Sequence, residues 1–174
     1  MMATDGQSID FLISLAEIAG VFVGFGVLIV AIQRIDEIAP ERKALAQGIS
    51  IIGLTAMLTA LLPPTLREFG LSGQDLWFYA SIGFFAIISI AFAAALGQQE
   101  FRKFNLVNFK KSPLLASVFW IGLEAPIQLA LLMVIFDVVP GIEHALYVFA
   151  VILSVAEAAM CLTLLVFHRE TALR

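Results

Sequence analysis

Three glutamates lie inside long apolar segments, where a carboxyl group is costly to bury and therefore informative about chemistry. Glu17, Glu124 and Glu157 are surrounded by aliphatic residues, and their segments contain no Lys or Arg. A charged side chain at the centre of a bilayer costs about 2.5–3.5 kcal/mol on insertion scales, so such residues usually mark a path for protons or ions. An apolar medium also favours the protonated carboxyl, which can donate a hydrogen bond to another helix. Transport and helix packing are therefore the two interpretations to separate.

The composition of the chain places these glutamates in a membrane protein. The 174 residues are 61% hydrophobic and 14% charged, and the mean hydropathy is +0.99. Soluble domains carry roughly 25% charged residues, so this composition excludes a soluble globular protein. The length suits one domain over residues 1–174. The single cysteine, Cys161, excludes a disulfide framework within the chain.

The apolar residues gather into segments long enough to cross a bilayer as helices. About 20 apolar residues span the roughly 30 Å hydrocarbon core, and apolar surroundings force backbone groups to pair within a helix. Pro63–Pro64 is expected to end the second segment, and Pro140–Gly141 the fourth. The sequence therefore predicts an all-α bundle of about five transmembrane helices. They cover residues 11–32, 44–62, 76–96, 114–139 and 145–167.

The basic residues predict the orientation of this bundle. With five crossings and an external N-terminus, nine of the ten Lys and Arg residues fall on one side and only Arg67 on the other. The second segment is the weakest of the five because it is short and holds Gln47 and Thr59, and without it the asymmetry collapses. The positive-inside rule therefore predicts an external N-terminus and a cytoplasmic C-terminus. The expected location is the bacterial cytoplasmic (inner) membrane.

Helical spacing groups polar residues around two of the glutamates. Glu124 and Gln128 share one face of the fourth helix, and Pro126 beside them removes a backbone hydrogen bond, which predicts a kink. Ser154 and Glu157 share a face of the fifth helix. At 1.5 Å per residue, the two glutamates reach a similar depth near the membrane centre. We expect these polar residues to line an ion or proton pathway.

The first helix combines its glutamate with small residues. Glu17 is expected roughly 9 Å below the outer end, where it would relay a proton or cation inward. Ala16, Gly20 and Gly24 follow a small-xxx-small pattern beside it, which predicts close packing against another helix. The six residues 15–20, LAEIAG, resemble the glutamate segment in the first helix of small multidrug resistance transporters. The resemblance implies a carboxyl group that exchanges protons for cationic substrates.

The stretch between the third and fourth predicted helices mixes aromatic and basic residues. Its place beside the membrane favours contact with anionic lipid headgroups, worth about 1 kcal/mol per basic residue, over binding of nucleic acid. The residues expected to contact headgroups are Arg102, Lys103, Lys110 and Lys111.

The familiar sequence patterns of enzymes are missing from the chain. It has no phosphate-binding loop, no dinucleotide fingerprint and no HExxH metalloprotease motif. His144 and His168 are predicted near opposite faces of the membrane, so they would not pair on a haem within one subunit. We expect no enzymatic activity, no cofactor and no bound metal.

Together these features predict an oligomeric channel or proton-coupled carrier that moves cations past the intramembrane glutamates. Glu124 and Glu157 would hold the central proton or cation. Five short helices are few to enclose a route alone, so self-association into a homo-oligomer is expected. The alternative is a structural or accessory subunit whose glutamates bond to the helices of a partner. A third interpretation is a membrane effector or sensor that responds to lipid.

Overall fold

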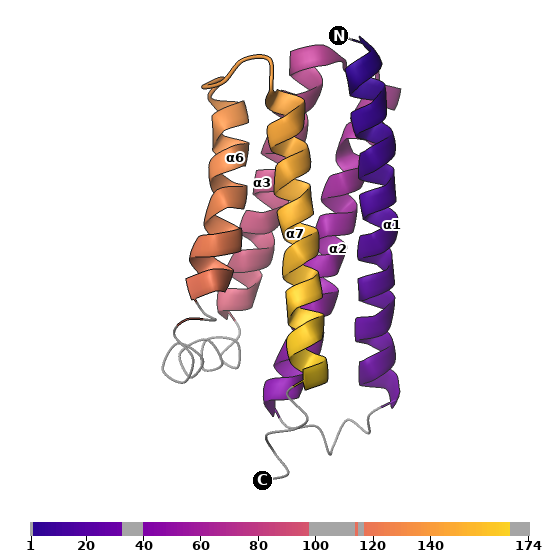
Figure 1. Cartoon of the computed structure of the whole chain (residues 1–174), viewed down its shortest axis with the longest axis vertical. Coiled ribbons are helices and arrows are strands. Elements are labelled where there is room, and N and C mark those ends of the chain that lie inside the picture. The colour runs from indigo at the N-terminus through magenta and orange to yellow at the C-terminus, as the bar shows by residue number, and fades with distance from the viewer. Residues whose placement is uncertain (1, 33–39, 98–113, 115–116, 168–174) are drawn as a thin grey trace.

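Helices make up almost all of the chain that the structure describes, and they stand side by side in one bundle (Figure 1). The computed structural model describes residues 2–32, 40–97, 114 and 117–167, and the predicted all-α class is confirmed for them. Successive helices alternate in direction, so the first begins and the last ends at opposite ends of the bundle. The elements are α1 (Met2–Ile32), α2 (Pro40–Glu68), α3 (Gly73–Gly97), η2 (Val118–Glu124) continuing directly into α6 (Ala125–Ile135), and α7 (Glu143–Phe167).

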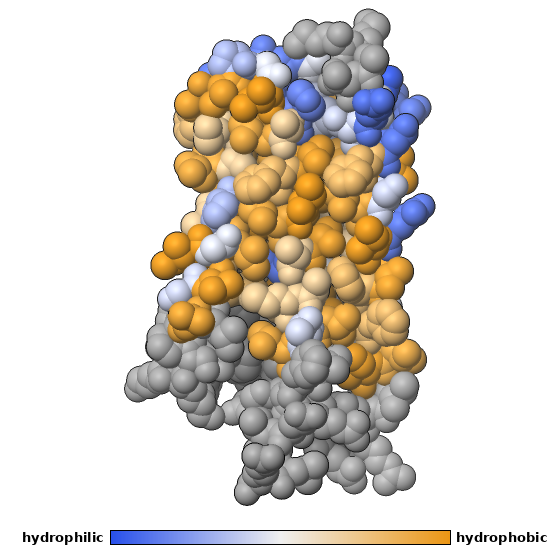
Figure 2. Space-filling model, in the orientation of Figure 1, coloured by the Kyte–Doolittle hydropathy of each residue, from blue (hydrophilic) through white to orange (hydrophobic). Residues whose placement is uncertain are grey.

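Four of these helices are long and apolar enough to cross a bilayer. On the face drawn in Figure 2, apolar residues cover most of the described part, and hydrophilic residues gather at the end where α1 begins. A bundle that exposes so much apolar surface needs lipid around it, because soluble proteins rarely expose large contiguous apolar patches. The prediction of a membrane protein with transmembrane helices is confirmed in this form. The four spans are Gly6–Ile29, Gly48–Glu68, Gly73–Ala94 and Glu143–Leu165.

The rod formed by η2 and α6 is shorter than the other helices. Its apolar stretch within the described residues is Ile121–Ile135, about 22 Å long at 1.5 Å per residue. The sequence predicted a helix to Val139, but α6 ends at Ile135 because the chain turns at Asp137, which takes a left-handed φ of 50°. The segment that precedes this rod lies outside the described residues. A full crossing by this fourth rod therefore stays a prediction.

The second helix continues through its two prolines, so the prediction that it ends at Leu62 is wrong. α2 extends to Glu68 and contains both Pro63 and Pro64. Pro63 has no N–H to donate to the carbonyl of Thr59, four residues earlier. The structure supplies another donor, because the hydroxyl of Tyr147 on α7 donates to that carbonyl at 2.6 Å. Membrane helices tolerate proline when neighbouring groups satisfy the freed carbonyl in this way.

Several helices also begin earlier than the apolar segments predicted. α1 begins at Met2, α3 at Gly73 and α7 at Glu143. The carboxylate of Glu143 accepts the N–H of Gly141 at 2.9 Å, which fixes the turn that leads into α7. Hydropathy marks the part of a helix that lies in lipid, whereas polar end residues remain helical beyond it.

α7 occupies the centre of the bundle. It contacts every other described helix, namely α1, α2, α3, η2 and α6. Its first turns carry Tyr147, which is fully buried between the rings of Trp77 and Phe84, with ring centroids 5.7 and 5.6 Å away. Because of this central position, polar residues on the inward face of α7 lie inside the protein instead of in lipid.

α1 and α2 approach each other closely at Gly53. A β-carbon added there would lie 2.9 Å from Cγ2 of Val23 and 3.4 Å from the carbonyl oxygen of Ala19. Gly26 on α1 is similarly tight, since its β-carbon would lie 3.0 Å from Oγ of Ser50. Glycine at these positions lets the two backbones pack against each other without intervening side chains.

Replacing Gly53 by Ala is expected to destabilise the bundle by about 1 kcal/mol. Overpacking costs about 1–3 kcal/mol, and the helix preference of Ala over Gly returns just under 1 kcal/mol. The measurement is thermal unfolding in detergent, followed by labelling of the buried thiol of Cys161 with a fluorogenic maleimide. The matched control is Gly24→Ala, because Gly24 has no atom within 4 Å of an added β-carbon. Equal midpoints for the two variants would contradict this packing argument.

Candidate functional site

Glu157 is the most deeply buried of the three intramembrane glutamates. It lies in α7 with 4% of its surface exposed, whereas Glu17 is exposed and Glu124 is half-buried. The three- and four-residue spacing of a helix face places Ser154 and Cys161 on the same inward side. Their exposed fractions are 3% and 7%, so this face of α7 carries a buried row of polar or polarisable groups.

A π-helix positions Glu124 next to this row. η2 ends at Glu124, directly before the turn that contains Pro126. Proline cannot donate a backbone hydrogen bond, so the carbonyl of Gly122 loses its usual partner and the helix winds more loosely here. A seven-residue π-helix, a feature often found at functional sites, lies directly before Pro126, and the kink that the sequence predicted there stays a prediction. On the next turn, Nε2 of Gln128 donates to Oε1 of Glu124 at 2.9 Å.

The carboxyl groups of Glu124 and Glu157 meet where η2 contacts α7. They lie close enough to interact through charge and through a side-chain hydrogen bond. Oε1 of Glu157 is buried, and no group in the described part of the chain bonds to it. Two neighbouring carboxylates repel each other strongly in an apolar interior, so the pair is suited to hold a shared proton or a cation. Within the described ranges, no three His, Cys, Asp or Glu side chains come together as metal ligands do.

Glu17 stands apart from this pair. It lies midway along the span Gly6–Ile29, on the exposed side of α1. Its neighbours on that side, including Val21 and Phe25, expose half or more of their surface. Its carboxyl forms no hydrogen bond or ion pair with another described residue. The structure therefore joins two of the three glutamates inside the bundle and leaves the third facing outward.

The small residues of α1 divide between the two sides of the helix. Ala16 is buried, and a β-carbon on Gly20 would make an ordinary contact with Sδ of Met57 on α2. Gly24 is exposed and open. Within this pattern Gly20 thus faces α2 and Gly24 does not, while the tightest glycine contact on α1 falls at Gly26.

Sequence reasoning missed a second group of buried polar residues, near the end of the bundle where α7 begins. Thr59 and Ser81 are both fully buried, and Trp77 exposes 2% of its surface. Tyr147 is 88 residues from the carbonyl of Thr59 to which it donates. No local pattern signals such a long-range contact, and single Ser, Thr, Trp and Tyr residues in apolar segments are too common to stand out.

The residues predicted to contact lipid headgroups cannot be placed in this bundle. Arg102, Lys103, Lys110 and Lys111 all lie outside the described residues.

The fold and the site define a class: a polytopic helical membrane protein in which a buried carboxyl group, that of Glu157, lies beside the half-buried one of Glu124. Comparisons with known protein families, with curated proteins and with solved structures find no match. The function must therefore be argued from the site itself.

Proposed function

We propose that this protein moves protons or small cations across a membrane, with Glu124 and Glu157 as its central binding site. The observation that carries the proposal is the contact of these two carboxyl groups inside the bundle, with Glu157 only 4% exposed. A purely structural role would leave one oxygen of Glu157 without a protein partner, at a cost of about 1–3 kcal/mol. A bound proton or cation would offset that cost. Gln128 would hold Glu124 in place for this role.

The proposal includes the orientation argued from charge. Five crossings would place the N-terminus outside and the C-terminus in the cytoplasm, with nine of ten basic residues on the cytoplasmic side. The alternating helix directions in Figure 1 support an odd number of crossings. The membrane would be the cytoplasmic membrane of a bacterium, and several copies would associate there.

The test is ion flux through purified protein in liposomes of phosphatidylethanolamine and phosphatidylglycerol. A potassium diffusion potential drives uptake, and dyes trapped inside report protons, alkali cations and divalent cations in separate preparations. We expect wild-type protein to carry protons or one class of cation faster than empty liposomes do. Single Glu124→Gln and Glu157→Gln replacements should slow that flux. Absence of any flux, or wild-type flux in both variants, would refute the proposal.

One observation favours a second candidate function, that of an accessory subunit. Glu17 lies midway along a membrane span and faces outward, whereas intramembrane acids almost always face protein or a water-filled cavity. A partner helix that covers this side of α1 would give the carboxyl a hydrogen bond or an ion pair. Val21 and Phe25, which expose 55% and 50% of their surface, would be covered by the same partner.

Mass spectrometry of the protein solubilised in mild detergent separates the two candidates. A stoichiometric unrelated partner that dissociates on Glu17→Ala replacement would favour the accessory role. A homo-oligomer with no other protein favours the transport role. The exposed Glu68, at the end of α2, provides a matched Glu→Ala control outside the span core.

A further inference from the structure

Three buried polar atoms mark one side of the bundle interior. They are the indole Nε1 of Trp77, the hydroxyl of Ser81 and Oε1 of Glu157, and they alone among the buried side-chain nitrogens and oxygens of the described ranges bond to no protein group. The residues expose 2%, 0% and 4% of their surface. Trp77 and Ser81 belong to α3 and Glu157 to α7, and these two helices contact each other. Water molecules between the helices would satisfy these atoms.

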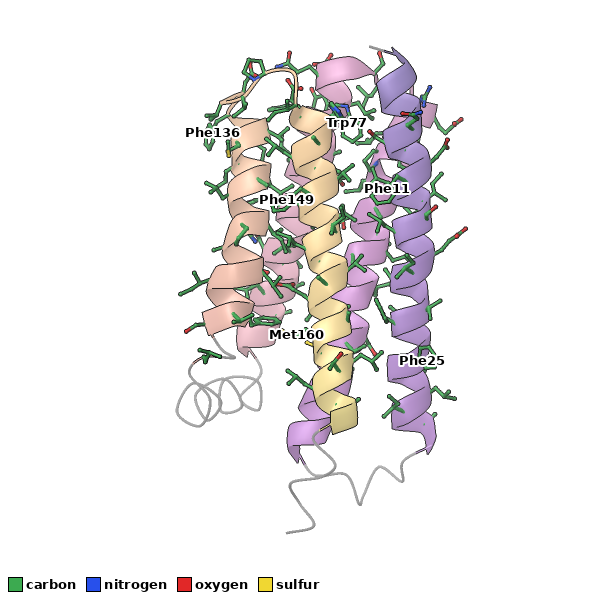
Figure 3. The ribbon with its side chains drawn as sticks, in the orientation of Figure 1. Phe11, Phe25, Trp77, Phe136, Phe149 and Met160 are labelled. Carbon is green, nitrogen blue, oxygen red and sulfur yellow. The ribbon has the colours of Figure 1, made fainter. Side chains whose placement is uncertain are left out.

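Ring contacts fix how α3 and α7 are aligned. The ring of Trp77 lies 5.7 Å from that of Tyr147, in the first turns of α7. Figure 3 shows Trp77 at the end of the bundle where α7 begins, and Met160, three residues beyond Glu157, far along the same helix. Ser81 lies one turn inward from Trp77. The ring of Phe84 lies 5.6 Å from that of Tyr147, so Ser81, between Trp77 and Phe84, is level with Tyr147. At 1.5 Å per residue, Glu157 then lies about 15 Å from Ser81 along the bundle axis.

A further hydroxyl group lies within that interval. Ser154 is 3% exposed and lies three residues before Glu157 on the same inward face of α7. The surroundings are apolar, since Phe84 and Val151 are fully buried at intermediate depth. About five hydrogen-bonded water molecules, at about 2.8 Å per link, cover about 15 Å. The two serines would bond to such a file along its length.

The unpaired groups suit different tasks in a file of water. An indole N–H can only donate, so Trp77 can orient a water molecule but cannot pass a proton on. A serine hydroxyl both accepts and donates, so Ser81 can pass a proton from one water to the next. Trp77 is therefore a positioning residue, and Ser81 a relay.

We propose that a file of water molecules between α3 and α7 conducts protons from the bundle end beside Trp77 to Glu157, with Ser81 as a relay. This inference rests on the proposed function and names its ion as the proton. Each water or hydroxyl accepts one proton and releases another, and the last proton joins a carboxylate oxygen of Glu157. A metal cation would need about six oxygen ligands at each step, whereas this route offers single hydroxyl groups.

The test compares Ser81 variants in the liposome assay. Ser81→Ala is expected to slow proton uptake severalfold, because the hydroxyl that both accepts and donates is lost and water replaces it only in part. Ser81→Thr keeps a hydroxyl and should restore the wild-type rate. Ser89→Ala is the matched control, because Ser89 is exposed on the same helix. Sodium and potassium uptake should stay at the level of empty liposomes throughout.

A second measurement detects the water directly. In Trp120→Phe protein labelled with nitrogen-15, the remaining indole N–H should show an exchange cross-peak with water by NMR. No such cross-peak would overturn the proposal. Wild-type proton flux in Ser81→Ala, combined with its loss in Glu157→Gln, would overturn the water file and leave the proposed function standing. A wild-type protein that carries no protons would overturn both.

Discussion

Proton uptake by liposomes that contain the Glu157→Gln variant is expected to fall at least about 100-fold below that of wild type. Glutamine keeps the size and hydrogen bonding of the side chain but cannot gain or release a proton. Glu157 is buried against Glu124, so no group from bulk water can replace it. The initial rate of the dye response after the potential is applied measures proton uptake, and the rates of wild type and variant are compared directly.

Two controls make this result specific. Glu68→Gln removes an exposed carboxyl at the end of α2 and should transport at the wild-type rate. The thiol of Cys161 lies one turn from Glu157 and is buried, so its slow labelling by maleimide reports that the variant is folded. A folded Glu157→Gln protein with the flux of wild type would show that Glu157 is a packing residue.

Tyr147→Phe is expected to destabilise the protein by about 2 kcal/mol, because the carbonyl of Thr59 then has no donor in the apolar interior. For a chain of this length, the unfolding midpoint should fall by about 4–8 °C. The ring and its contacts with Trp77 and Phe84 are kept, so the change isolates the hydroxyl. Maleimide labelling of Cys161 during heating in detergent measures the midpoint.

A second replacement identifies the reason for that loss. Pro63→Ala restores a backbone N–H four residues after Thr59, and this N–H can donate to the same carbonyl. In the Pro63→Ala background, Tyr147→Phe should therefore cost less than about 0.5 kcal/mol. An equal cost in both backgrounds would mean that the hydroxyl of Tyr147 does not replace the missing donor of Pro63.

The apolar pattern was sufficient to predict helices because a membrane leaves the backbone no other way to pair its polar groups. It could not predict where α2 ends, since that depends on Tyr147, which follows Pro63 by 84 positions in the chain. Local rules treat a double proline as a helix end. The hydroxyl of Tyr147, which satisfies the carbonyl that Pro63 leaves without a donor, is brought there only by the three-dimensional fold.

The candidate site was predictable in part for a related reason. Counting residues along helices placed Glu124 and Glu157 at one depth, and the structure places their carboxyl groups in contact. The depth of a residue does not determine how its helix is rotated about its axis, however. That rotation decides whether the side chain faces another helix or the lipid. Glu17 and Gly24 face outward because the side of α1 that packs on α2 is set by Gly26 and Gly53. The small-residue spacing of Ala16, Gly20 and Gly24 suggested one packing face, and the spacing alone could not show that Gly26 makes the tighter contact.

A change of winding in the π-helix beside Pro126 would move Glu124. A π turn holds one more residue than an α turn, so rewinding η2 as an α-helix would rotate the residues on one side of it by about 100° relative to the other. Pro126 has no backbone N–H and donates no hydrogen bond in either winding. Rewinding the helix at this position therefore breaks one backbone hydrogen bond fewer than rewinding a helix without proline. Such a rotation would carry Glu124 out of contact with Glu157, and a one-residue shift of helical register would open and close the carboxyl pair.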